Sequence, residues 1–233
     1  MPSIPFTAYD IFAYLTSGFV VIAAGDFAFP GSWILDRELT VVQVFVWIGV
    51  AYIVGHVVAG LSAPAFQELL VEGKLGKREQ ALWGGAKWKK QTRSRLKWLF
   101  PGYFDPLPED IKARVESKAR KESIAPDRDG LFLYCDAQMR QKPEVAPVLG
   151  NFLNIYAFAR NACLAALVAA VLLVVGAIFH RSDWETKAWL AAAAVVVAIF
   201  LFYRYVKFFR LYARDVFLFY STADSPTSQR CPK

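Results

Sequence analysis

The chain has 233 residues and is 56% hydrophobic, 15% aromatic and 20% charged, with a formal net charge of +7. A soluble domain usually contains about 25% charged and 45–50% apolar residues. Here, long uncharged segments alternate with strongly basic ones. This pattern argues against an ordinary soluble globular protein and indicates an integral membrane protein.

Four apolar segments have the length of membrane spans, which need roughly 17–25 residues. They cover residues 11–29, 39–63, 161–179 and 188–206. The first contains Asp26, and the fourth reaches full length only if Arg204 extends its charged end to the membrane interface. We therefore predict an all-α membrane protein whose four transmembrane helices form two hairpins.

The segment between the second and third spans, residues 64–160, contains 18 of the 27 basic residues. Segments rich in lysine and arginine remain on the cytoplasmic side of a membrane. Residues 204–233 are also basic. We therefore expect the insert and both termini to be cytoplasmic.

The insert has the pattern of a helical domain rather than of a linker. Helices are expected at residues 64–76, 107–122 and 129–140, and a fourth helix should begin near Glu144 and run into the third span. The fourth span is expected to continue as a cytoplasmic helix over residues 207–220. The tail, residues 221–233, is expected to be disordered.

His56 is an ionisable residue in the otherwise apolar stretch "AYIVGHVVAGLS" of the second span. It should lie about 10 Å from the cytoplasmic end of that helix, at roughly 1.5 Å per residue. An antiparallel first span would bring Asp10 or Tyr14 to the same level. His56 then either fixes helix packing or has a proton, ion or gating role. Packing is favoured by small residues that allow close approach, namely Gly49, Gly55 and Gly60.

Asp26 is an acidic residue within the first predicted span. It should lie near the outer face, too far from His56 to pair with it. It either lines an outward-facing vestibule or sits at the membrane interface.

A second candidate site is the basic and aromatic segment "WGGAKWKKQTRSRLKW". Such a cluster beside a span is typical of binding to anionic lipid headgroups. A phosphate-bearing ligand such as a nucleotide or nucleic acid is an alternative, and a simple topology signal is a third. The residues concerned are Lys87, Lys89, Lys90, Arg93, Arg95, Lys97, Trp88 and Trp98.

The predicted extension of the fourth span carries a basic stripe, formed by Arg204, Lys207, Arg210 and Arg214. Aromatic and apolar residues fall mainly on the other faces, namely Tyr205, Phe208, Phe209, Tyr212, Val216 and Phe219. The segment either lies on an anionic membrane surface or packs its aromatic face against the cytoplasmic helices. Packing is the simpler interpretation.

Motifs for catalysis, metal binding and cofactor binding were not found. The sequence lacks GxSxG, HExxH, a phosphate-binding GxxxxGK[ST] loop and a glycine-rich dinucleotide turn. Its two histidines are expected at opposite faces of the membrane, and its three cysteines are expected to be free thiols. We therefore expect no metal, no cofactor and no enzymatic activity. A membrane-embedded lipid-modifying enzyme would need two carboxylates, or His56 with Asp10, in a polar cavity.

Three stretches, "YDIFAYLTSGF", "NFLNIYAFARN" and "RYVKFFRLYARDVF", resemble a loosely defined group of bacterial four-span inner-membrane proteins with a cytosolic helical insert. The resemblance covers the spans and their junctions but not the insert between Lys74 and Gln141. It implies a bacterial inner-membrane location and supports the four-span topology. It implies no activity and no catalytic residue.

Together these features favour a signalling or effector protein. Its basic insert would bind an anionic ligand or a protein partner and couple it to a homo-oligomeric transmembrane bundle, with a change in membrane permeability as one outcome. A non-conducting membrane anchor or scaffold is the alternative.

Overall fold

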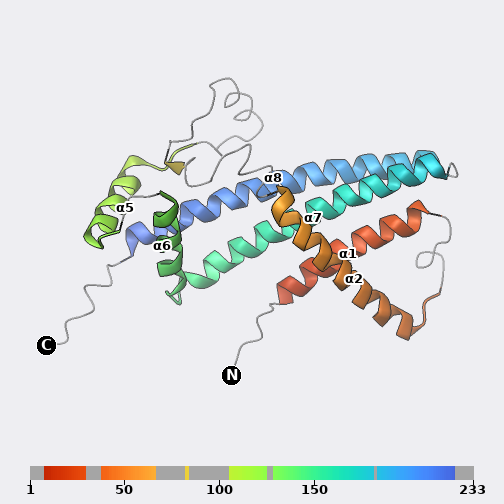
Figure 1. The fold of residues 1–233 in the computed structure, drawn as a ribbon, viewed down its shortest axis with the longest axis horizontal. Coiled ribbons are helices and arrows are strands. Elements are labelled where there is room, and N and C mark those ends of the chain that lie inside the picture. Colours follow the sequence, from red (N-terminus) through yellow and green to blue (C-terminus); the bar gives the residue numbers. More distant parts are fainter. Residues whose placement is uncertain are drawn as a thin grey trace, which may run out of the picture. The chain divides into compact units, whose positions relative to one another are not determined.

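The computed structural model of the chain describes residues 8–29, 38–66, 82–83, 105–124, 128–180 and 183–223. These residues are helical with short connections and contain no strand, which confirms the predicted fold class (Figure 1). The helices are α1 (Ala8–Ala28), α2 (Val41–Ser62), α5 (Glu109–Lys121), α6 (Arg128–Arg140), α7 (Ala146–Phe179) and α8 (Trp184–Thr222).

Four of these helices, α1, α2, α7 and α8, are long and apolar enough to cross a membrane. Helices α7 and α8 contain the third and fourth predicted spans, whereas α1 ends one residue before the end of the first and α2 lacks residues 39, 40 and 63 of the second. Helices α7 and α8 have 34 and 39 residues, or roughly 50 and 60 Å at 1.5 Å per residue. The hydrocarbon core of a bilayer is only about 30 Å thick, so each of these helices has a substantial section outside it. Both extensions agree with the sequence-based expectation.

The chain divides into two compact units. The first unit comprises residues 1–70 and 154–205, and the second comprises residues 71–153 and 206–233. Helices α7 and α8 contribute residues to both.

In the first unit, α1 and α2 touch each other through their backbones. A Cβ atom on Gly18 would overlap the carbonyl group of Ala51, and one on Gly55 would overlap the carbonyl group of Tyr14. Gly55 therefore has the predicted close-packing role. The same expectation is wrong for Gly49 and Gly60, which have no described atom within 4 Å of where a Cβ would lie. These two glycines face away from the α1–α2 contact.

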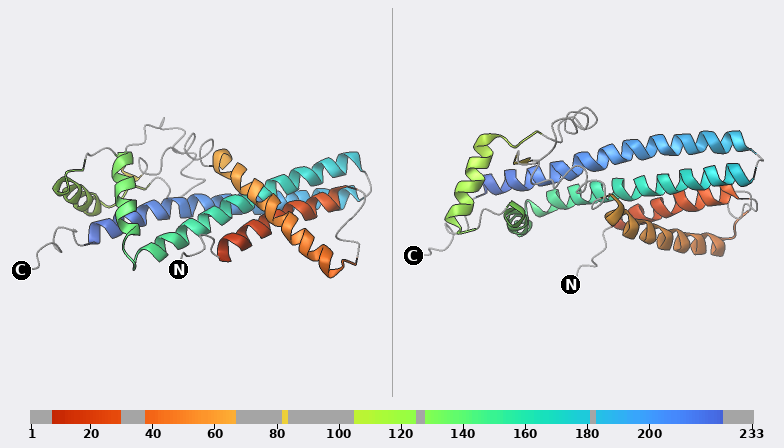
Figure 2. Two further views of the ribbon diagram at one scale, coloured as in Figure 1. Left: turned by 60° about the horizontal axis from the view of Figure 1, so that its bottom comes forward. Right: turned by 45° about the horizontal axis from the view of Figure 1, so that its top comes forward.

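Helix α7 packs against both α1 and α8 within the first unit. Gly176 allows the backbone of α7 to approach Ala28 of α1, where a Cβ would clash. Helices α7 and α8 run side by side (Figure 2), and the Cys163 thiol donates to the carbonyl of Ala198 at 3.2 Å. A hydrogen bond to a backbone carbonyl is a common way to satisfy a small polar group between membrane helices.

The end of α2 is tied to α7 by polar groups. The Ser62 hydroxyl lies 2.6 Å from Oδ1 of Asn161, and the Nε–H of Arg160 donates to Ser62 Oγ at 3.1 Å. Ser62 and Asn161 are both buried. The other end of α2 begins at a capping box, in which Thr40 Oγ1 accepts from the backbone N–H of Gln43 and the Gln43 side chain accepts from the N–H of Thr40.

The second unit has a core of its own, built from α5, α6, the start of α7 and the last part of α8. Helix α5 begins after Pro108, has Glu109 and Asp110 in its first turn and ends in basic residues, as the helix dipole favours. The buried core consists of Leu82, Leu107, Val115, Ala119, Leu131, Phe132, Cys135, Met139, Leu149, Tyr212, Ala213, Val216, Phe217 and Tyr220.

Candidate functional site

His56 lies on α2 beside the aromatic rings of Tyr14 and Tyr52. Its ring stacks on that of Tyr14 at a centroid distance of 4.1 Å, and the Tyr52 ring meets it edge-on at 4.6 Å. The structure thus places Tyr14, one of the two expected neighbours, against His56. The His56 side chain is nevertheless exposed at the surface of the protein. It contacts the adjacent helix from the rim of the α1–α2 contact rather than from inside a buried pocket.

Asp10 and Asp26 lie near opposite ends of α1. Asp10 belongs to its first turn, and its side chain lies outside the described part of the chain. Asp26 is half-buried in the last turn. Tyr14 and Asp26 are separated by roughly 18 Å along the helix, at 1.5 Å per residue. Asp26 is therefore remote from His56, as expected from the sequence.

The basic segment between Lys87 and Lys97, with Trp88 and Trp98, lies outside the described residues. Its flank at Leu82 and Trp83 is described. Leu82 is fully buried, and Trp83 meets the ring of Phe217 edge-on at 5.8 Å. Leu82 and Trp83 therefore belong to the core of the second unit and its immediate surroundings.

The four side chains of the basic stripe of α8 differ in their exposure to solvent. Arg204 and Lys207 are exposed. Arg210 donates to the backbone carbonyl of Asp105 at 2.6 Å, and Arg214 forms an ion pair with the neighbouring Asp215 at 3.0 Å.

The opposite side of α8 is buried in the core of the second unit, which confirms packing rather than adsorption to a membrane surface for this face. The buried face is wider than predicted. It includes Ala213, Phe217 and Tyr220, whereas Phe208 and Phe219 are only half-buried.

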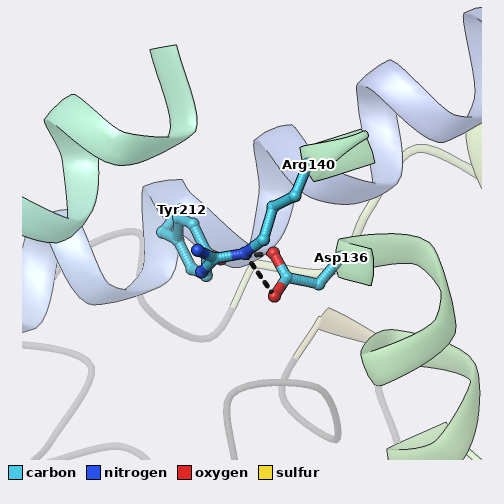
Figure 3. Close-up of polar contacts among 3 residues, drawn as sticks. All are labelled: Asp136, Arg140 and Tyr212. Carbon is cyan, nitrogen blue, oxygen red and sulfur yellow. Dashed lines mark hydrogen bonds and ion pairs between the residues drawn. The ribbon is translucent and has the colours of Figure 1, made fainter. Parts of the chain in front are cut away.

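A closed set of three polar contacts joins α6 to this face of α8 (Figure 3). The Tyr212 hydroxyl donates to Oδ1 of Asp136. Arg140 donates through one nitrogen to the Tyr212 oxygen at 2.7 Å and through Nε to Asp136 Oδ2 at 2.9 Å. Burial raises the pKa of Tyr212, and the hydrogen bond to Asp136 raises it further. Tyr212 is therefore a neutral donor rather than a candidate general base.

A second set of polar contacts holds the end of α8 against α5. The ammonium group of Lys118 donates to the carbonyl oxygens of Tyr220 and Ala223 at 2.9 and 2.7 Å, and it lies 4.3 Å from the centre of the Tyr220 ring. The Tyr220 hydroxyl donates to Oε2 of Glu122 at 2.7 Å. A cation at this position neutralises the partial negative charge of the helix end.

The Cys135 thiol, which lies in the core of the second unit, remains protonated at neutral pH. Burial, followed by the nearby Glu122, raises the pKa of the Cys135 thiol to about 12. A thiol that remains protonated at neutral pH is a poor nucleophile. Among the described residues, no three histidine, cysteine or acidic side chains are grouped so that they could hold a metal ion.

Sequence reasoning missed both polar sets. The spacing of Asp136 and Arg140, four residues apart on one helix, is a signal for an ion pair. By contrast, the partners on α8 lie 76 and 102 residues from Asp136 and Lys118. Their pairing depends on the tertiary fold.

The fold defines a multi-pass helical membrane protein with a second, separately packed helical unit. The comparisons with known proteins return no matching family model, curated protein or solved structure.

Proposed function

We propose that this chain is an integral membrane signalling or effector protein of the bacterial inner membrane. Its second unit lies in the cytoplasm and binds an anionic ligand or a protein partner. Binding is coupled to a homo-oligomeric transmembrane bundle and changes the permeability of the membrane. The net charge of +7 and the concentration of basic residues in the insert support the orientation and the preference for anions.

The observation that carries this proposal is the construction of α8. It is one uninterrupted helix from Trp184 to Thr222, with an apolar half in the first unit and a half packed into the core of the second. Polar contacts attach the latter half to α6 through Tyr212 and to α5 through Tyr220. A ligand that moves α5 or α6 therefore acts on the same helix that contributes to the bundle.

Ion flux tests the proposal. The full chain is reconstituted in vesicles of phosphatidylcholine, with or without phosphatidylglycerol as an anionic probe, and release of an enclosed ion is followed by a fluorescent indicator. We expect flux that depends on the anionic lipid and is lost when Lys87, Lys89, Lys90, Arg93, Arg95 and Lys97 are all replaced by Gln. A matched control exchanges Lys and Arg at the same positions, keeps the charge and should keep the flux. Vesicles that stay sealed under every condition contradict the change in permeability.

The proposed orientation has its own test. A reporter that works only in the cytoplasm should be active when it is fused at residue 100 or at the C-terminus. A reporter that works only in the periplasm should be inactive at the same positions. Activity of periplasmic reporters at these positions contradicts the orientation.

A non-conducting anchor or scaffold is the second candidate, and the stacking of His56 on Tyr14 favours it, because this contact contributes to the packing of α2 on α1. Replacing His56 by Gln separates the two functions. An anchor keeps its membrane location and its partner in this variant, whereas a gated bundle changes its flux. The comparison requires a partner captured with the wild-type chain under the same conditions.

A further inference from the structure

An open pocket of about 530 Å³ lies between α5 and the C-terminal end of α8, within the second unit. Its size is within the range of about 300–1,000 Å³ that is typical of small-molecule sites. Besides two alanines, the part of its lining that the structure describes consists of cationic and hydroxyl side chains, without an acidic or aromatic residue: Arg114, Ser117, Lys118, Lys121, Ser221 and Thr222.

The three cationic side chains differ in how they are held. Lys118 is buried and fixed by the two carbonyl groups at the end of α8. Arg114 pairs with Asp110 at 3.1 Å, but both side chains are about 60% exposed, so water screens the pair and it contributes little. Lys121 has no ion-pair partner among the residues that the structure describes.

The lining carries three cationic side chains, and the opposing charges lie around it. They are about half a negative charge at the C-terminal end of each of α5 and α8, the carboxylate of Asp110, which pairs with Arg114, and that of Glu122, which accepts from Tyr220. The positive charge that is exposed to the pocket is that of Arg114 and Lys121. Lys121 and the free side of the Arg114 guanidinium are where an incoming anion meets this charge.

The hydroxyl groups of the lining also restrict the chemistry of the ligand. Ser221 donates its proton to the carbonyl of Leu218, and Thr222 donates to the carbonyl of Leu218 or Phe219. These two oxygens therefore present lone pairs rather than protons to a ligand. They match a ligand that carries hydroxyl donors of its own beside an anionic group.

We propose that this pocket binds a phosphate monoester of a polyol, with the phosphate between Arg114 and Lys121 and the polyol hydroxyls toward Ser221 and Thr222. A phosphate offers several acceptor oxygens to these donors. A nucleotide fits less well, because the described residues of the lining offer no aromatic ring on which a base could stack. This inference rests on the proposed function in taking the second unit as the part that receives an anion.

The test is calorimetric titration of the full chain in phosphatidylcholine nanodiscs with glycerol phosphate, inorganic phosphate and glycerol. We expect glycerol phosphate to bind more tightly than inorganic phosphate and glycerol to show no binding. Lys121→Gln and Arg114→Gln should each weaken glycerol phosphate binding by about tenfold, since a hydrogen bond to a charged group contributes that much. Arg120→Gln is the matched control, because Arg120 lies on the same helix, is 81% exposed and does not line the pocket. It should change the affinity by less than about twofold.

Phosphatidic acid carries the same glycerol phosphate group on a lipid and distinguishes the two sources of the ligand. If the lipid is the source, nanodiscs that contain phosphatidic acid reduce the apparent affinity for glycerol phosphate, and Lys121→Gln removes this competition. If the source is soluble, the affinity is unchanged. Both outcomes support the pocket as the site.

Three results overturn the inference: no binding of glycerol phosphate, equal weakening by Arg120→Gln and Lys121→Gln, or glycerol phosphate binding that is lost only when Lys87–Lys97 are neutralised. The last result leaves the proposed function intact, because the second unit still receives an anion, but through a different surface.

Discussion

Replacing Tyr212 by Phe removes one hydroxyl from the contact between α6 and α8 and leaves the buried ring in place. The hydroxyl donates to the Asp136 carboxylate and accepts from Arg140. A hydrogen bond to a charged group contributes about 1.5–3 kcal/mol. The Asp136 side chain is 18% exposed, so water partly replaces the lost donor. We therefore expect a loss of about 2 kcal/mol in the local stability of the second unit.

The buried Cys135 thiol provides the assay. Its side chain is fully buried, so a thiol reagent reaches it only when this region opens. Labelling of the folded protein, followed by mass spectrometry of the Cys135 peptide, reports the population of the open form. A loss of about 2 kcal/mol corresponds to labelling that is roughly thirty times faster. Cys163 and Cys231 fall in other peptides and do not interfere.

A double-mutant cycle with Asp136→Ala isolates the contact itself. If the hydroxyl and the carboxylate interact as the structure shows, the two changes together should cost about 1.5 kcal/mol less than the sum of the single changes. Arg114→Gln, which breaks the exposed pair with Asp110, should change Cys135 labelling by less than a factor of about two. Strictly additive effects of Tyr212→Phe and Asp136→Ala would falsify the reasoning.

Three further predictions concern the crossing of α1 and α2, the end of α8 and the response to alkaline pH. Gly55→Ala places a Cβ against the carbonyl of Tyr14 and should destabilise the hairpin by about 1–3 kcal/mol in a detergent unfolding titration, whereas Gly60→Ala, with open space around it, should not. Lys118→Met keeps the aliphatic contact but leaves two carbonyl groups uncapped, so hydrogen exchange in the last turn of α8 should become about tenfold faster, and Lys121→Met should leave it unchanged. The pKa of Cys135 is about 12 in the folded protein, against 9.0 for the unfolded thiol. As the pH rises above 9.0, only the unfolded state ionises. The contribution of this thiol to stability is therefore intact below pH 9.0 and declines toward pH 12. At pH 10 the decline should be about 1.4 kcal/mol in thermal unfolding followed by circular dichroism, and Cys135→Ala should remove this part of the pH dependence.

The membrane helices could be predicted from the sequence because hydrocarbon imposes one simple requirement. Each span must satisfy its own backbone hydrogen bonds and remain apolar over its length. The continuation of α8 beyond the span could also be predicted from the sequence, because its basic and aromatic residues repeat with the period of a helix. The exact buried face was not, since α5 and α6 cover α8 from two sides and include Phe217 and Tyr220 in the core.

Other features depend on contacts that no local pattern encodes. Lys118 stands in a strongly basic helix and would be assigned to a solvated surface, yet it is buried against the end of α8. The role of each glycine in α2 also depends on the partner. Gly55 contacts α1. Gly49 and Gly60 also stand among mainly apolar residues in the sequence, but a Cβ atom on either would have no described atom within 4 Å.

At Gly18 and Gly55 the backbones of α1 and α2 are in direct contact, so at this crossing the backbone sets the distance between the two helices of the first hairpin. Residues on its outer surface, such as Phe45 and Val57, can therefore be exchanged without shifting the crossing. The hairpin therefore combines a constant helix crossing with outward-facing residues that can vary. Its exterior is free to adapt to new lipids or neighbouring subunits while the geometry beneath it is preserved.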